Sequence, residues 1–389
     1  MSESPPLKQS LGILFIIVAT ELIGFGLIIP ILPQLALQFK VSTLLIGVLM
    51  GAYSFAQFLA APLLGSLSDR YGRKPILIIS KLGTVLAYII MAKSHTFEWF
   101  LVSRLIDGFT GGNIAVARAY VSDITTPENR PKGMAIIGIS FGVGFLLGPI
   151  LGGFLYTDTM AYESAAWVAA GLSLLATVLT IILLKEPKRH NHMASGFEKL
   201  TSGWKSLASP IIRSICMLYF AYMIIFSCFE TSFSVFTHYL FEYTPRQNSW
   251  LFVYVGVLAL FIQGGIVRRQ FTNLSRVCVF GLICVGLGFI GISIANSLLI
   301  LVLTMAVLSI GVGVSNSFLP ALLSLHITKD NQGRVMGIYE SIGSLSRIIG
   351  PLIAYQFVIV TPRKGYFLCG LVLITITLGL SKMLYYRSK

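Results

Sequence analysis

Long apolar segments recur along the whole chain and restrict its fold more than any other feature of the sequence. A run of about 20 apolar residues crosses the hydrocarbon core of a bilayer as an α-helix. Twelve such segments can be read, over residues 10–33, 43–66, 75–93, 96–122, 131–156, 163–184, 211–240, 247–267, 276–295, 298–325, 333–359 and 365–384. Only 11% of the 389 residues are charged, whereas about a quarter are charged in soluble domains. The chain is therefore predicted to be an all-α membrane protein with twelve transmembrane helices.

The remaining composition argues against several other classes of protein. A net charge of +14 would suit nucleic acid, but the position of the basic residues explains it better, and no nucleic-acid partner is expected. No phosphate-binding G-x-x-x-x-G-K-[ST] loop occurs, which argues against an ATP-driven pump. Cysteines lie in apolar segments without metal or disulfide spacing, at Cys216, Cys228, Cys278, Cys284 and Cys369. We predict no enzymatic activity, no catalytic residue, no metal site and no cofactor.

The distribution of lysine and arginine predicts the orientation of the chain. With both termini in the cytoplasm, the inside segments hold 20 of these residues and the outside loops hold 5. Such an excess on one side follows the positive-inside rule. We therefore expect a multi-pass protein of the plasma membrane, the inner membrane in a bacterium, that works as a monomer in the lipid bilayer. Phe197, Leu200, Trp204 and Leu207 have helical spacing and predict a short interfacial helix in the linker.

The two halves of the sequence resemble each other at an offset of 202 residues. The matching pairs are Asn129 and Asn331, Met134 and Met336, Ile136 and Ile338, Gly148 and Gly350, and Pro149 and Pro351. Two six-helix repeats related by an axis along the membrane normal form one known transporter plan, with the substrate site between the halves. We predict two pseudo-symmetric bundles, over residues 1–184 and 211–389, joined by a cytoplasmic linker over 185–210.

The turn after the second segment, Gly65 to Pro75, carries the most specific motif. It reads Gly-Ser-Leu-Ser-Asp-Arg-Tyr-Gly-Arg-Lys-Pro, in which Gly72 permits a tight turn and Asp69 can accept hydrogen bonds from amides that open the next helix. The string resembles, position by position, the loop motif G-x-L-x-D-R-x-G-R-K of the major facilitator superfamily. The resemblance implies the major facilitator fold and a conformational latch made of Gly65, Asp69, Arg70, Gly72, Arg73, Arg118 and Asp123. The corresponding loop of the second half, Gly264 to Arg276, contains no acid, so a latch there is expected to be degenerate or absent.

The fourth segment carries Arg104, Asp107 and Gly108. The spacing resembles the R-x-x-x-G motif of the same superfamily, which is implicated in proton transfer. Charges at this depth of a bilayer are unfavourable unless they are paired or hydrated. The two readings, a structural Arg104–Asp107 ion pair and a role in proton coupling, are compatible.

The fifth segment resembles the antiporter motif of this superfamily, through Gly144, Gly148, Pro149, Gly152 and Gly153. Proline kinks a helix, and small residues give a flat face for close helix packing. Among superfamily members the first half is most similar to tetracycline–proton antiporters, yet the acids and histidine of that group that handle the drug align with Ala87, Ala259 and Val285. Only the acid of the first segment is kept, as Glu21. The resemblance therefore implies the scaffold of a drug–proton exchanger with a different cargo.

Ionisable residues inside membrane segments are functional candidates by default. We assign proton coupling to Glu21, Asp107, Glu230 and Glu340, and the substrate cavity to Arg104, Ser234, Arg347 and Phe229. Glu340 has a second reading as the partner that neutralises Arg347, and Phe229 has one as ordinary packing. Lys81 is expected to extend its amine toward the cytoplasmic interface.

Two functions remain open at this point. The first is export of a small amphipathic organic molecule in exchange for protons, driven by the proton gradient. The second is proton-coupled transport, in either direction, of an anionic, carboxylate-rich metabolite such as a siderophore, because arginine is a favourable partner for a carboxylate. Unpaired acids in the cavity would favour the first function, and an unpaired arginine would favour the second.

Overall fold

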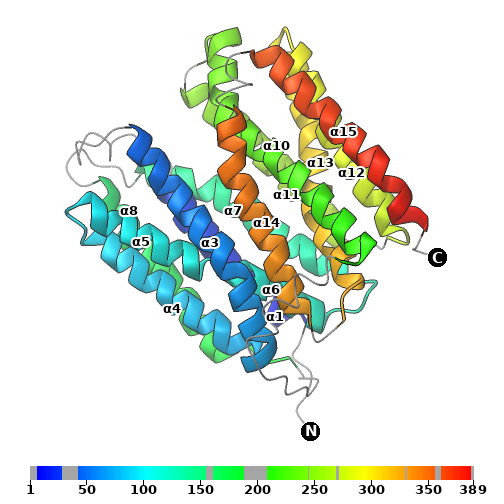
Figure 1. Cartoon of the computed structure of the whole chain (residues 1–389). Coiled ribbons are helices and arrows are strands. Elements are labelled where there is room, and N and C mark those ends of the chain that lie inside the picture. Colours follow the sequence, from blue (N-terminus) through cyan, green and yellow to red (C-terminus); the bar gives the residue numbers. More distant parts are fainter. Residues whose placement is uncertain are drawn as a thin grey trace. The chain divides into compact units, whose positions relative to one another are not determined.

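The computed structural model describes residues 7–28, 43–154, 161–187, 208–243, 245–268, 271–328, 331–354 and 361–386. Almost all of these residues are α-helical (Figure 1). The helices are α1 (Leu7–Ile28), α3 (Thr43–Tyr71), α4 (Arg73–Ala92), α5 (Phe97–Thr110), α6 (Asn113–Ile124), α7 (Arg130–Phe154), α8 (Ala161–Leu183), α10 (Pro210–Phe241), α11 (Pro245–Arg268), α12 (Leu274–Ile294), α13 (Leu298–Leu325), α14 (Gln332–Ile353) and α15 (Pro362–Tyr386). The interfacial helix predicted in the linker lies outside the described residues.

Each predicted membrane segment corresponds to one of these helices, except that two short helices replace the fourth. The helix predicted over 96–122 is interrupted between α5 and α6 at Gly111 and Gly112. Glycine is the weakest helix former apart from proline. A Cβ atom at Gly111 would lie 2.7 Å from the hydroxyl of Tyr53, so this position also requires a residue without a side chain.

The helices present apolar surface that suits lipid. Within the described residues, eight helices are long and apolar enough to cross a membrane. Large apolar side chains stand on their outer faces; Phe261 is 76% exposed and Ile182 is 70% exposed. Helices satisfy all of their backbone hydrogen bonds internally, which allows such a surface to contact hydrocarbon. The protein is a multi-pass membrane protein.

The chain divides into two compact units. The first unit comprises residues 1–126, 139–205 and 327–344, and the second comprises 127–138, 206–326 and 345–389. The first part of α14 thus packs with helices from the other half of the sequence. The division into bundles at 1–184 and 211–389 stays a prediction.

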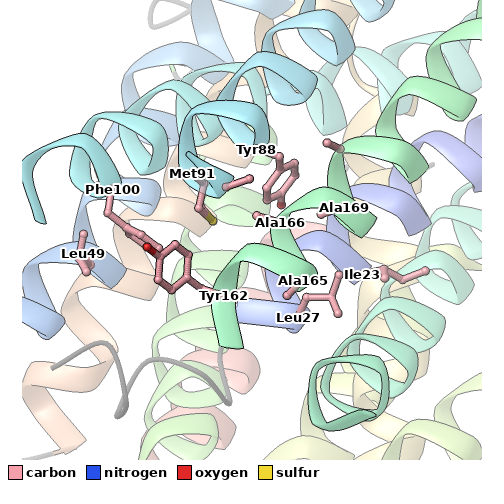
Figure 2. Close-up of a cluster of buried hydrophobic side chains, with 12 residues drawn as sticks. Ile23, Leu27, Leu49, Tyr88, Met91, Phe100, Tyr162, Ala165, Ala166 and Ala169 are labelled. Atoms are coloured by element: carbon pink, nitrogen blue, oxygen red, sulfur yellow. The ribbon is translucent and has the colours of Figure 1, made fainter. Parts of the chain in front are cut away.

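A buried apolar cluster holds five helices of the first unit together, namely α1, α3, α4, α5 and α8 (Figure 2). Tyr88 and Met91 of α4, Phe100 of α5, and Tyr162 of α8 are almost fully buried in it. The rings of Phe100 and Tyr162 meet edge to face with centroids 5.6 Å apart, a favoured geometry for aromatic pairs. The Tyr162 hydroxyl also donates a 2.5 Å hydrogen bond to the Ser94 carbonyl. In this cluster α4, α5 and α8 pack against the face of α1 that contains Ile23 and Leu27.

Two glycines of the first unit make the packing testable. A Cβ atom at Gly108 of α5 would overlap the backbone carbonyl of Tyr53 in α3, whereas a Cβ at Gly171 of α8 would meet nothing within 4 Å. We expect Gly108→Ala to lower the free energy of unfolding by about 1–3 kcal/mol, because backbone must shift. Gly171→Ala should raise it by about 0.5–1 kcal/mol, because alanine favours the helix. Unfolding temperatures in detergent measure both; equal effects of the two substitutions would contradict the close α3–α5 contact.

Candidate functional site

The turn between α3 and α4 is built around Gly72. Its φ of 106° lies in a region that side chains other than glycine avoid. The Gly72 amide donates to the Ser68 carbonyl over 3.1 Å, which closes the end of α3. The chain can then reverse within one residue, so that α4 begins at Arg73.

Arg73 is the centre of the polar contacts at this turn. Its Nη1 donates to Asp69 Oδ1 and to Ser68 Oγ, each over 2.6 Å, and its Nε donates to Asp123 Oδ2 over 2.8 Å. Arg73 thereby connects the end of α3 with the end of α6. Glu186 accepts the Arg73 and Lys74 amides over 2.7 and 2.8 Å, which caps the N-terminus of α4.

Asp69 also binds the N-terminus of α14. Its two oxygens accept the backbone amides of Gly333 and Arg334, each over 2.9 Å. An acid at a helix N-terminus is stabilised by the free amides and by the helix dipole. Burial raises the pKa of the Asp69 carboxyl, and the Arg73 guanidinium opposes this shift. Gly65 and Gly333 are in backbone contact, since a Cβ on either would overlap the other's carbonyl oxygen.

We call Asp69, Arg73, Asp123, Gly333 and Arg334 the latch cluster, because the loop motif predicts a conformational latch here. Sequence reasoning singled out the first three but missed Gly333, Arg334 and the capping residue Glu186. The repeat was the available signal, because Asn331 opens the second-half turn that Asp69 contacts. Arg70 lies in the same turn with its guanidinium over the Tyr71 ring, 5.1 Å from the centroid.

A second polar cluster is buried inside the first unit. Lys81 of α4 donates to Glu21 Oε2 of α1 over 2.8 Å, and neither side chain is more than 1% exposed. Asn113 of α6 donates to the same oxygen over 3.1 Å. Lys81 therefore does not extend to the interface as expected. Ionisable side chains inside membrane segments usually pair with one another, and Glu21 provides that partner for Lys81.

Arg104 and Asp107 of α5 lie beside this pair. Arg104 Nη1 and Asp107 Oδ2 are 2.8 Å apart, and both side chains are buried. The Arg104 guanidinium also lies over the rings of Tyr53 and Phe25, 4.6 and 5.7 Å from the centroids. Asp107 interacts electrostatically with Glu21 and Lys81. We call Glu21, Lys81, Arg104 and Asp107 the buried quartet; it carries two positive and two negative groups.

Glu340 of α14 pairs with Arg118 of α6 rather than with Arg347. Arg118 Nε and Glu340 Oε1 are 2.7 Å apart, and both side chains are buried. Gln57 of α3 links the same region, because it donates to the Gly111 carbonyl over 3.0 Å and accepts from Ser344 Oγ over 2.9 Å. The ion pair of Arg118 thus joins α6 to α14. The assignment of Arg118 to the conformational latch stays a prediction.

The candidates in the second unit gather on α10 and α14. Glu230 interacts electrostatically with Arg347. The ring of Phe229 packs against Phe233, Phe252 and Phe289, with centroids 4.7, 5.8 and 5.9 Å away. Phe229 is buried in this aromatic cluster. The side chain of Ser234 lies outside the described residues.

The antiporter motif lies where α7 approaches α1. A Cβ at Gly144 would overlap Leu22, and one at Gly148 would lie 2.7 Å from the Cα of Gly26. Gly152 and Gly153 continue α7, and the side chain of Pro149 lies outside the described residues. In the part of the chain that the structure describes, no group of three or more His, Cys, Asp or Glu side chains could hold a metal ion.

Comparison with known proteins places these features in a family. The family model of the Major Facilitator Superfamily matches residues 14–351. The chain belongs to the Major Facilitator Superfamily. It is a membrane transporter and not an enzyme, and the twelve helices predicted from sequence are those of this superfamily's fold.

Individual relatives in the superfamily cover almost the whole chain. The human major facilitator superfamily domain-containing protein 10 is 29% identical, over 90% of this chain and 88% of the relative. The class H tetracycline resistance protein of Pasteurella multocida is 30% identical, over 89% of this chain and 88% of the relative. The crystal structure of the human organic anion transporter MFSD10 superposes with a TM-score of 0.85, at 27% identity, over 98% of this chain and all (100%) of that one. The resemblance to drug–proton antiporters inferred from the motifs is confirmed.

Proposed function

We propose that the protein is a secondary active transporter that exports a small amphipathic organic molecule in exchange for protons. The observation that supports this cargo is the similarity to a tetracycline resistance protein. The buried acids are paired with bases, Glu21 with Lys81, Asp107 with Arg104, and Glu340 with Arg118, so unpaired charge favours neither cargo. Each pair is neutral when its acid is ionised. Protonation of the carboxyl would leave the base without its partner, and the base would then favour a different arrangement of the helices.

Coupling follows from this property. A proton that binds to a buried acid and a substrate that contacts the same group compete for one site, so each favours the state that the other disfavours. The superfamily's repeat plan places such a site between two bundles that rock around it. We assign proton binding to Glu21, Asp107, Glu230 and Glu340. The latch cluster stabilises one conformational state, the one in which Asp69 binds the N-terminus of α14.

A second candidate is proton-coupled transport of an organic anion with carboxylate groups. Two findings favour it: a solved relative is titled an organic anion transporter, and the tetracycline-handling acids are absent at Ala87 and Val285. Arg118 and Arg347 would bind the carboxylate when protonation releases Glu340 or Glu230. We expect a monomer in the plasma membrane, with both termini in the cytoplasm and no cofactor besides the proton gradient.

Exchange in proteoliposomes with an imposed pH gradient tests the coupling. Glu21→Gln is best made together with Lys81→Met, because the single change would leave a buried lysine charged. We expect this double variant, and Glu230→Gln, to retain substrate binding but to lose most of the acceleration that a pH gradient gives. Unchanged pH-driven exchange in both variants would rule out Glu21 and Glu230 as the coupling acids.

The cargo is tested with the same vesicles. A lipophilic cationic dye and an aromatic dicarboxylate of similar size would be compared as competitors of transport. Competition by the cation alone supports the first candidate, and competition by the dicarboxylate alone supports the second. If neither competes, both substrate classes are wrong.

A further inference from the structure

A groove opens between the end of α12 and the start of α15, both in the second unit. Its volume is about 550 Å³. The side chains that matter for its chemistry are Ile294, Asn296, Arg363, Lys364, Phe367 and Leu368. None of the polar clusters described above contributes to this groove.

The packing of the two helices explains why the groove forms there. α12 and α15 are in close contact at Gly370, where a Cβ would lie 2.5 Å from the Gly286 carbonyl oxygen. Ile294 and Arg363 lie about two helical turns beyond this contact, roughly 10–12 Å along each axis. The small residues bring the helices together at one level, and the larger side chains separate them at the helix ends.

The charges in the groove are all positive. Arg363 and Lys364 are exposed, no acid lines the groove, and neither residue forms an ion pair with any described acid. Both lie in the first turn of α15, where the helix dipole disfavours a cation. In the predicted orientation they also lie on the outer side of the membrane, where the positive-inside rule predicts few basic residues. An anion bound between them would remove both conflicts, and the free amides at the start of α15 would add hydrogen bonds.

The walls of the groove are apolar and face outward. Ile294, Phe367 and Leu368 are 59%, 43% and 55% exposed. The exposed apolar surface continues along α15 through Leu371 and Val372. A ligand that binds here therefore combines an anionic group at the helix end with a hydrocarbon part that runs along the helix.

We propose that this groove is a binding site for an anionic phospholipid of the surrounding bilayer. The phosphate lies between Arg363 and Lys364, a polar headgroup contacts Asn296, and one acyl chain covers Phe367 and Leu368. Arginine and lysine side chains form charge-assisted hydrogen bonds with phosphate oxygens. The site is separate from the proposed transport pathway and does not depend on which substrate the protein carries.

Binding of phosphatidylglycerol to the purified, delipidated full chain tests the proposal. Native mass spectrometry and the unfolding temperature would be measured during titration, with phosphatidylcholine as the zwitterionic comparison. We expect the wild type to prefer phosphatidylglycerol, and the double variant R363Q/K364Q to bind it about 30-fold more weakly, as expected for the loss of two basic contacts. R363K/K364R, which keeps both charges, should retain most of the affinity.

Lys93→Gln is the matched control, because Lys93 is also exposed and is expected on the same side of the membrane. It should leave the preference for phosphatidylglycerol unchanged. Equal binding of the two lipids by the wild type would overturn the proposal, and so would a preference that survives in R363Q/K364Q. An equal loss in Lys93→Gln, or displacement of the lipid by millimolar inorganic phosphate, would also overturn it, since the site would then be general surface charge or a simple anion site.

Discussion

Lys81→Met is expected to lower the free energy of unfolding by about 3–5 kcal/mol, the range for breaking a buried ion pair from one side. Lys81 and Glu21 are almost fully buried and 2.8 Å apart. Without the amine, the Glu21 carboxylate keeps only the hydrogen bond from Asn113. One of its oxygens already has no hydrogen-bond donor among the described residues. The measurement is the unfolding temperature and denaturant midpoint of the purified protein in detergent.

The double variant Glu21→Gln/Lys81→Met shows whether Lys81 stabilises the fold through its charge or through the volume of its side chain. Replacing both members of a buried pair by neutral groups of similar size is often close to neutral for stability. We therefore expect the double variant to recover most of the loss. Lys93→Met, at the exposed end of the same helix, should change stability by less than about 0.5 kcal/mol. If the single and double variants are equally unstable, the lysine acts through its packing and not through its charge.

Asp69→Asn is expected to slow transport at least about tenfold while substrate affinity changes little. Hydrogen bonds to a charged acceptor contribute about 1.5–3 kcal/mol each, and Asp69 accepts from Gly333, Arg334 and Arg73. Weakening this contact by that amount changes the population of the latched state by about 10- to 150-fold. The proposed substrate site does not include Asp69, so the effect should fall on the rate of the conformational change.

Two measurements together test the role of Asp69. Transport rate and substrate affinity are determined for the variant, and hydrogen exchange is followed at the Gly333 and Arg334 amides, which should exchange faster. Lys74→Gln is the control, since it removes a charge from the same turn at a lysine whose amine donates to the Ile181 carbonyl. A loss of affinity with an unchanged rate would contradict the latch, as would unchanged exchange at the two amides.

Hydropathy was sufficient to predict the transmembrane helices because the bilayer permits so few backbone conformations. Without water in the hydrocarbon core, an unpaired backbone group is very unfavourable, and apolar runs must become helices. The same argument does not locate a local break. The interruption at Gly111–Gly112 depends on the approach of Tyr53 from α3, which is a contact between helices and not a property of the segment.

The loop motif could be recognised from the sequence because several of its contacts join residues that are close together in the chain. Gly72 and the contact between Arg73 and Asp69 lie within one turn, so the residue types and their spacing are enough to predict that part of the geometry. The partners of Asp69 on α14 are more than 260 residues away, and they are backbone amides, which no side-chain pattern reveals. Glu186 was missed for a similar reason, because a single acid in a polar linker looks like ordinary solvated charge.

Sequence alone was sufficient to predict a membrane transporter of twelve helices, and it singled out almost all of the buried ionisable residues. It also predicted the Arg104–Asp107 pair, whose members lie one turn apart on the same helix, but not the pairs between helices. Glu340 could pair with Arg347 on its own helix face, but it pairs with Arg118; Lys81 could reach the interface, but it binds Glu21. Several oppositely charged partners are equally compatible with helical spacing. Only the packing of one helix against another brings a particular pair within 3 Å and excludes the alternatives.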